Sequence, residues 1–210
     1  MKKDKHYVHY WDEKWDNPEI RSKWILPAVE LLDYIHTHPY LPRKVLDISC
    51  GIGRHMLFYE KKGVLAIGLD NSPIAVKRCQ SILKENNKDA NVVLASMYRM
   101  PILSGSFDMI ISLYSIYHGT IEEIQELINE IFRILQNGGR ALINVAKYTH
   151  PINDELEIET RTYIRGSRKN GIHHYFLLEE ILEMVSLFKL EKLIETDNYF
   201  VLHLKKCNMY

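Results

Sequence analysis

The sequence predicts an α/β fold built on a doubly wound, mostly parallel sheet of seven strands. Two observations support this prediction. From Lys44 onward, short apolar runs alternate with longer stretches of helical periodicity, and the last two apolar runs can pair as a hairpin. We therefore expect helices on both faces of the sheet and an antiparallel last strand. A length of 210 residues, 46% of them hydrophobic, is enough for one domain with one core.

Five apolar runs supply the expected strands of the central part of the sheet. They are residues 44–48, 64–69, 91–95, 107–113 and 140–147. Crossover helices are expected between the first three runs, at 53–62 and 72–86. Ser72 can cap the second of these helices, and Pro73 suits its first turn.

The clearest helical pattern covers residues 121–136, where apolar residues recur at spacings of three and four and form one face. These residues are Ile124, Leu127, Ile128, Ile131 and Leu135. The pattern stops at residues 137–139, Asn-Gly-Gly, because glycine commonly ends a helix.

Segments on either side of this core complete the predicted single domain, residues 1–210. Residues 1–40 are expected to form a helical lid, and the helical pattern at 18–38 predicts an inward face. That face comprises Trp24, Leu31, Leu32 and Ile35. Residues 148–176 form a polar insertion that could cover a substrate. The expected C-terminal elements, within 177–210, are a helix at 177–187 and hairpin strands at 189–194 and 199–205.

The most informative stretch is residues 45–53, an apolar strand that runs into a loop of small residues and then a helix. Gly51 and Gly53 leave space for a ligand against the backbone, and the start of the helix offers amide donors to a carboxylate. A dinucleotide-binding loop would have a third glycine where this sequence has Met56, so a pyrophosphate would fit poorly. Asp70, about twenty residues after the loop, can accept hydrogen bonds from ribose hydroxyls. The expected ligand is a nucleoside without a diphosphate.

Four segments in order resemble the motifs of class I S-adenosylmethionine-dependent methyltransferases: residues 47–53, 68–73, 106–111 and 135–140. The resemblance covers residues 44–147. It implies a Rossmann-like methyltransferase fold, S-adenosylmethionine as the cofactor, S-adenosylhomocysteine as the product, and an enzyme of the small-molecule methyltransferase type.

The resemblance also implies roles for individual residues. Asp47 would order the loop near the methionine amino group, and Asp70 would hold the ribose. Gly51 and Gly53 would let the methionine part of the cofactor lie against the backbone. The full set of expected cofactor-binding residues is Trp11, Asp47, Ser49, Cys50, Gly51, Gly53, Asp70, Asn71, Ser72, Ser96, Met97 and Leu113.

Two positions depart from the family's usual pattern. Ser96 stands where the family often has an acidic residue that hydrogen-bonds the adenine amino group, so adenine recognition would use backbone groups at Ser96 and Met97. Ser49 replaces the usual glycine of the loop, which narrows the space for the cofactor without closing it. Both departures are compatible with cofactor binding.

The segment after the fourth strand, residues 113–119, is expected to form the wall that faces the methyl acceptor. Methyl transfer from a sulfonium is an in-line displacement, so this wall must align a nucleophile and, where required, remove its proton. His118 is the candidate general base, and the alternative is that it packs at the start of the next helix. The candidate substrate-binding residues are Tyr114, Tyr117, His173 and His174.

Two further segments have open alternatives. His173 and His174 could border the acceptor pocket or fill a structural role, and they lack a partner set for a metal, so no metal site is expected. The aromatic segment 7–15, which includes Trp11, could close over the cofactor as a lid or simply cover core surface.

Charge and composition narrow the acceptor. Lys+Arg and Asp+Glu both count 27, and this balance predicts no general attraction to nucleic acid or to an anionic membrane. Tyr114-Ser115 replaces the acidic or amide residue, two prolines and aromatic residue of base-amino methyltransferases of this fold. Neither Cys50 nor Cys79 is placed for cysteine-dependent ring methylation. We expect a small-molecule acceptor methylated on oxygen, nitrogen or sulfur, and nucleic acid is disfavoured.

The three cysteines match neither a disulfide framework nor a zinc pattern, and no apolar leader or membrane-length apolar run is present. These features predict a cytoplasmic protein.

Two other functions stay open at this point. The first is a noncatalytic regulatory or partner subunit that binds S-adenosylmethionine, which the departures at Ser49 and Ser96 motivate. The second is a protein or RNA methyltransferase with substrate contacts in residues 148–169, which a local group of basic residues motivates. These basic residues are Arg161, Arg165, Arg168 and Lys169. The sequence does not indicate an oligomeric state.

Overall fold

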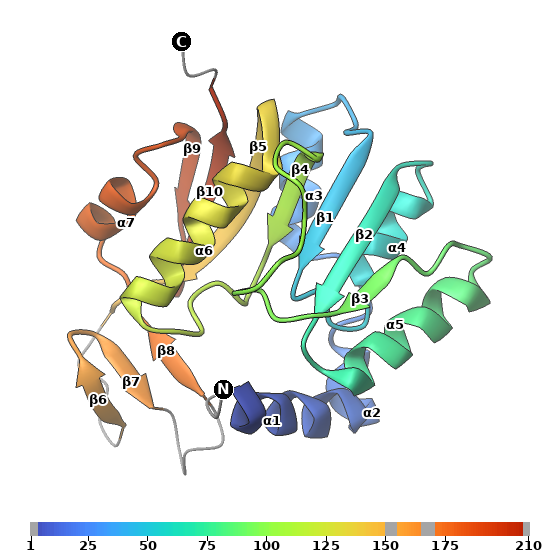
Figure 1. Cartoon of the computed structure of the whole chain (residues 1–210), viewed down its shortest axis with the longest axis horizontal. Helices are drawn as coiled ribbons and strands as arrows, with labels where there is room; N and C mark the ends of the chain where they lie inside the picture. Colours follow the sequence, from blue (N-terminus) through green and yellow to red (C-terminus); the bar gives the residue numbers. More distant parts are fainter. Residues whose placement is uncertain (1–3, 150–154, 165–170, 208–210) are drawn as a thin grey trace.

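The computed structural model describes residues 4–149, 155–164 and 171–207, and these form a seven-stranded mixed sheet with a small three-stranded sheet beside it (Figure 1). The strand order of the large sheet is β3-β2-β1-β4-β5-β10-β9. The strands are β1 (Lys44–Ile48), β2 (Leu65–Asp70), β3 (Val92–Leu94), β4 (Phe107–Ser112), β5 (Leu135–Ala146), β9 (Lys189–Glu195) and β10 (Tyr199–Lys205). β1 to β5 are parallel, and β10 is antiparallel to both of its neighbours. The predicted fold class is confirmed.

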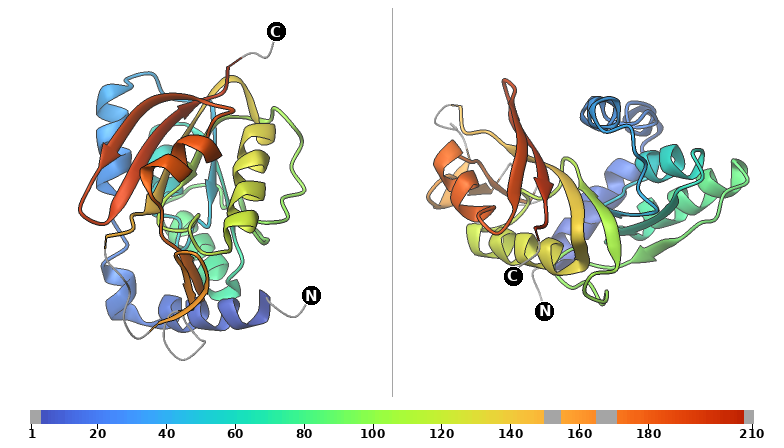
Figure 2. Two further views of the ribbon diagram at one scale, coloured as in Figure 1. Left: turned by 90° about the vertical axis from the view of Figure 1, so that its left-hand side faces the viewer. Right: turned by 90° about the horizontal axis from the view of Figure 1, so that it is seen from above.

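Helices cover both faces of the sheet (Figure 2). One face packs against α3 (Val29–Thr37), α4 (Arg54–Glu60) and α5 (Pro73–Glu85), and the other against α6 (Ile121–Ile134) and α7 (Leu178–Met184). Neighbouring residues of β1 point to opposite faces, as strand geometry requires: Val45 packs with Met56 and Leu83, whereas Leu46 packs with Ile128 and Ile181. Each face therefore has its own buried apolar layer.

The turn from α6 into β5 differs from the prediction. The helix ends at Ile134, and the strand begins directly at Leu135 and runs through the Asn-Gly-Gly stretch at 137–139. The register with β4 shifts between Phe107 and Met109, so this stretch forms a bulge. Glycine still matters there, because Gly138 has a φ of +79°.

The predicted helix at 18–38 is wrong as a single element. It is two helices, α2 (Pro18–Ser22) and α3, and Pro27 lies in the gap between them. Proline disfavours a helical conformation in the residue before it and cannot donate the hydrogen bond of a continuing helix. The restart changes the helical phase, so Leu31 and Tyr34 are buried while Leu32 is 44% exposed. Trp24 and Ile35 are partly buried, as expected for an inward face.

α1 (Asp4–Asp16) lies below the carboxyl ends of β1 and β2 in Figure 1. The 148–176 insertion contains the small antiparallel sheet of β6 (Leu156–Glu159), β7 (Thr162–Ile164) and β8 (Ile172–His174). Backbone hydrogen bonds join this insertion to the core: His174 N–H donates to the Tyr117 carbonyl, and Phe176 N–H donates to the Ala146 carbonyl. In the part of the chain that the structure describes, no helix is long and apolar enough to cross a membrane.

Candidate active site

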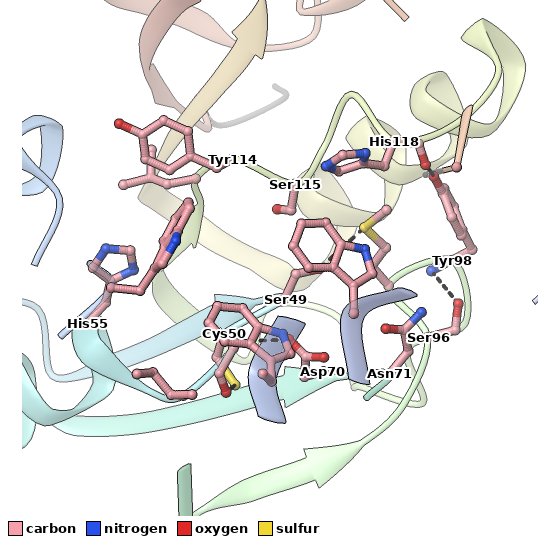
Figure 3. Close-up of a pocket in the computed structure, with 18 of the residues that line it drawn as sticks. Ser49, Cys50, His55, Asp70, Asn71, Ser96, Tyr98, Tyr114, Ser115 and His118 are labelled. Atoms are coloured by element: carbon pink, nitrogen blue, oxygen red, sulfur yellow. Dashed lines mark hydrogen bonds between the residues drawn. The ribbon is translucent and has the colours of Figure 1, made fainter. Parts of the chain in front are cut away.

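A cavity of about 500 Å³ opens at the carboxyl ends of the parallel strands, with α1 and the insertion contributing to its walls. This edge of the sheet is where doubly wound folds bind their ligands. Figure 3 shows Tyr114 and His55 at one end of the cavity, His118 and Tyr98 at the other, and Asp70 between them. The predicted site residues that line it are Trp11, Ser49, Cys50, Gly51, Asp70, Asn71, Ser96, Met97, Leu113, Tyr114 and His118.

The loop after β1 is held in an unusual backbone conformation. Ser49 and Gly51 have φ values of +59° and +55°, in the left-handed region. For Ser49, which replaces the usual glycine, this conformation is strained, and surrounding contacts must hold it. Cys50 N–H donates to the Leu69 carbonyl at 3.0 Å, and Gly51 N–H donates to the Asp70 carboxylate at 2.8 Å. β2 therefore fixes the shape of the loop.

Asp70 supports the loop after β1 and also lines the cavity. Its second carboxylate oxygen accepts Ser72 N–H at 2.9 Å, and the side chain lines the cavity although the residue is only 5% exposed. Burial raises the pKa of this carboxyl to about 6, and the N–H groups of Ser72 and Gly51 limit the rise because they favour the charged form. The site therefore holds a carboxylate whose charge changes close to neutral pH.

Three predicted cofactor residues lie behind the cavity wall instead of on it. Asp47 is buried, and its carboxylate lies 3.5 Å from His55 Nδ1. Since His55 Nε2 accepts the Ala28 N–H at 3.3 Å, Nδ1 carries the proton that faces Asp47. Gly53 packs against Cys79, and Ser72 is fully buried as the cap of α5. These residues shape the loop and the helices beside it.

His118 is surrounded by rings from distant parts of the chain. Its centroid lies 4.2 Å from that of His173 and 5.5 Å from that of Trp11. Tyr117 packs beside both histidines, at 4.7 and 5.7 Å. The Tyr98 hydroxyl donates to the His118 carbonyl, which fixes the backbone there. The structure brings His118, Tyr117 and His173 together, but only His118 lines the cavity.

His174 does not face the cavity, although it was predicted as a substrate-binding residue. It is 1% exposed, and its Nδ1 is 2.7 Å from the Thr162 hydroxyl. Burial lowers its pKa. Adjacent residues of a strand point to opposite sides, so only one of His173 and His174 can turn toward His118.

Tyr114, in the segment after β4, is constrained through both its backbone and its side chain. Its φ is +63°, and its N–H donates to Oδ1 of the fully buried Asn144 at 2.6 Å. Its hydroxyl donates to the Glu30 carboxylate. Burial, followed by the hydrogen bond to Glu30 and the charge of that carboxylate, raises the Tyr114 pKa well above its usual value. Asn144 and Glu30 thus hold the backbone and ring of Tyr114 from two sides.

Sequence reasoning missed eleven residues that line the cavity: Trp15, Trp24, Ile52, Arg54, His55, Tyr98, Ser115, Glu123, Ile164, Gly171 and Ile172. Trp15 lay inside the aromatic segment already suggested as a lid, and Arg54 directly follows the glycine loop, so both had a sequence signal. Ile164 and Ile172 had none, because the insertion's strands approach the cavity only through tertiary packing.

A glycine-containing loop after β1 and a carboxylate at the end of β2, on this strand order, are the features of a Rossmann-like nucleoside-binding protein. Comparisons with known proteins give the family. Residues 45–139 match the family model described as a methyltransferase domain. Residues 45–139 therefore form the methyltransferase domain of a class I S-adenosylmethionine-dependent methyltransferase, and the cofactor of this class is S-adenosylmethionine.

Relatives within this family differ in their named acceptors. Mouse (Mus musculus) tRNA (carboxymethyluridine(34)-5-O)-methyltransferase is 31% identical over 59% of this chain and 17% of its own length. Ajmaline N-methyltransferase of Rauvolfia serpentina is 30% identical over 59% of this chain and 44% of its own. The chain thus spans less than half the length of either relative. A solved Burkholderia thailandensis 1,6-didemethyltoxoflavin-N1-methyltransferase shares the fold, with a TM-score of 0.72 and 18% identity over 96% of this chain and 88% of its own.

Proposed function

We propose that this chain transfers a methyl group from S-adenosylmethionine to an oxygen, nitrogen or sulfur atom of a small molecule. The observation that supports this most is the cavity itself. The loop at residues 49–53, proposed to bind the cofactor, and the segment 113–119, which contains His118, both contribute to its walls. Its mixed aromatic and polar lining suits a small ligand.

Within the proposal, residues 1–40 and 148–176 act as lids on a single domain, and the protein works in the cytoplasm.

The residues present fit the cofactor. Asp70 offers a carboxylate for the ribose hydroxyls, and Ser96 and Met97, which line the same cavity, would recognise adenine through their backbone groups. Met56 is fully buried with its sulfur 3.7 Å from Cys79, so the position of a third loop glycine is filled by packed side chains. That packing disfavours a pyrophosphate. When bound, the cofactor supplies a methyl group activated by its sulfonium.

In this proposal His118 removes a proton from the acceptor. It lines the cavity, and Tyr98, Trp11 and His173 hold its backbone and ring in place. A neutral imidazole is a suitable base near neutral pH, and positioned bases contribute about 100-fold or more to such reactions. Tyr114 and Ser115 complete the wall beside it.

The test is release of S-adenosylhomocysteine from S-adenosylmethionine against a panel of small phenols, thiols and amines. We expect turnover with a member of the panel and a loss of about 100-fold or more in His118→Asn, with cofactor binding retained. His36→Asn, an exposed histidine on α3, is the matched control. Cofactor binding without turnover on any acceptor would instead support a noncatalytic regulatory or partner subunit.

A second candidate acceptor is RNA, because one relative is named a tRNA (carboxymethyluridine(34)-5-O)-methyltransferase and another a tRNA U34 carboxymethyltransferase. Because of those relatives, the expectation that nucleic acid is an unlikely partner is not supported. Among the basic residues that suggested such contacts, Arg161 forms an ion pair with Glu180, and Arg165, Arg168 and Lys169 lie outside the described residues. Incubating the chain with methyl-labelled cofactor and two RNAs, unmodified tRNA transcripts and tRNA that carries carboxymethyluridine at position 34, separates the two acceptors. Label on either RNA contradicts the small-molecule proposal.

A further inference from the structure

Arg54 is a charged side chain in an unusual setting. It follows the cofactor loop, lines the cavity and lies against two rings: its guanidinium carbon is 4.6 Å from the Trp24 centroid and 5.7 Å from the Tyr114 centroid. Its hydrogen-bond partner is the Leu26 carbonyl at 3.3 Å. The rings fix the guanidinium plane and leave further N–H donors for a ligand.

No carboxylate of the described residues forms an ion pair with Arg54. Of the nearby acids, Glu30 accepts a hydrogen bond from the Tyr114 hydroxyl, and the Asp47 carboxylate lies beside His55, 3.5 Å from its Nδ1. Burial lowers the pKa of Arg54, and Asp47, Tyr114 and Glu30 only partly oppose that effect. A partly desolvated guanidinium without a paired anion is costly, and a ligand carboxylate would compensate for it.

The layout of the cavity indicates which carboxylate this is. In Figure 3, Ser96 lies at the Tyr98 end, Asp70 in the middle and Tyr114 at the opposite end. A cofactor with adenine near Ser96 and ribose on Asp70 directs its amino-acid part toward Tyr114 and Arg54. The methyl acceptor would then bind near His118, at the opposite end of the cavity from Tyr114.

We infer that Arg54, seated on Trp24 and Tyr114, binds the carboxylate of the cofactor's amino-acid part. The planar fork of arginine matches a carboxylate with two parallel hydrogen bonds. Glu30 acts through Tyr114 as a positioning residue, because it holds the ring on which Arg54 lies. This inference rests on the proposed function, since it requires that the cavity binds S-adenosylmethionine.

Calorimetry with two ligands tests the assignment without any turnover. S-adenosylhomocysteine contains the amino-acid part, whereas 5′-methylthioadenosine has the same adenosine and a thioether but lacks it. In Arg54→Met we expect the affinity for S-adenosylhomocysteine to fall by about 10- to 100-fold and that for 5′-methylthioadenosine to stay unchanged. Arg54→Lys should recover part of the loss, because it restores the charge without the fork.

Arg43→Met is the matched control and should leave both affinities unchanged. It removes an exposed arginine at the amino end of β1, whereas the cavity lies at the carboxyl end. Equal losses for both ligands in Arg54→Met would mean a disturbed loop and overturn the inference. Unchanged S-adenosylhomocysteine binding would also overturn it. If Arg54→Met then lowered turnover of acceptors that carry a carboxylate but not of neutral acceptors, Arg54 would bind the acceptor's carboxylate instead. No binding of S-adenosylhomocysteine by the unaltered chain would overturn the proposed function as well.

Discussion

The indole ring of Trp15 lies directly against the α-carbon of Gly51. A Cβ atom built on residue 51 would come within 2.7 Å of Trp15 Cζ2, and the residue has a φ of +55°. α1 therefore packs on the loop after β1, residues 49–53, at a point where only glycine leaves room.

Gly51→Ala should destabilise the protein by about 2–4 kcal/mol, because left-handed strain adds to overpacking against Trp15. It should also weaken S-adenosylhomocysteine binding. Gly63→Ala is the control, since Gly63 has a φ of +76° but nothing within 4 Å of an added Cβ. Denaturant unfolding measures both. If both alanine substitutions lower the free energy of unfolding equally, contact with Trp15 does not contribute to the effect. In a Trp15→Leu background, the destabilisation by Gly51→Ala should become smaller and that by Gly63→Ala should stay the same.

Asp12 holds α1 on the core. Its carboxylate accepts from the Ser72 hydroxyl and, at 3.4 Å, from Ile74 N–H at the start of α5. Asp12→Ala should increase the dissociation rate of S-adenosylhomocysteine by about 5- to 30-fold, as expected for losing about 1–2 kcal/mol of α1 docking. Stopped-flow displacement measures that rate. Asp16→Ala, which breaks only the exposed pair with Arg78, should change it little; a similar acceleration in both would argue against the Asp12 contact.

Asp70 should make cofactor binding depend on pH. Ribose hydroxyls donate to a charged carboxylate, and the Asp70 pKa is about 6, so protonation competes with binding. The affinity for S-adenosylhomocysteine should be constant above pH 7 and fall toward a tenfold loss per pH unit below 6. Calorimetry from pH 5 to 8 measures this, and Asp70→Asn should bind weakly with a flat profile. A wild-type profile that is flat down to pH 5 would contradict the assignment.

The same shift acts on the stability of the ligand-free protein with the opposite sign. The folded-state pKa of Asp70 is above the ordinary 3.8, so its contribution to the free energy of unfolding is complete below 3.8 and is lost as the pH rises through about 6. Asp70→Asn removes that part of the pH dependence, which thermal melts of the ligand-free protein would detect.

His203 should lower stability in mild acid. It is 1% exposed on β10, both ring nitrogens lack hydrogen-bond partners among the described residues, and its ring lies 5.0 Å from that of Tyr34. Burial, with smaller effects from the charges of His38 and Lys192, lowers its pKa to about 4. The stability that comes from the neutral ring is present above 6.5 and is lost as the pH falls toward 4.

Between pH 6.5 and 5, His203→Phe should therefore lose stability less steeply than the wild type, by up to about 1.4 kcal/mol per pH unit. Denaturant unfolding at each pH gives the slopes. His174, whose pKa burial also lowers, acts in the same direction and stays present in both proteins. His36→Phe, on the exposed side of α3, should keep the wild-type slope, and an unchanged slope in His203→Phe would contradict the buried-histidine explanation.

The sequence by itself determined the features that depend on neighbours along the chain. Strand alternation around Leu46, the cap at Ser72 and the carboxylate at Asp70 follow from local pattern, and parallel topology then places the ends of β1 and β2 side by side. The position of the glycine-containing loop after β1, beside Asp70, could be predicted for that reason. The break in the N-terminal helix also had a local signal, since Pro27 disfavours a continuous helix, but the apolar spacing there predicts one helix instead.

Only the tertiary structure decided the side chains that complete the cavity. Arg54 becomes a binding candidate because Trp24 and Tyr114, thirty residues before it and sixty after, supply the rings it lies on. His173 meets His118 because β8 hydrogen-bonds to the loop after β4. The physical reason is the same in both cases: burial, ring stacking and ion pairing depend on distances in space, and periodicity along the chain records only which face a residue takes.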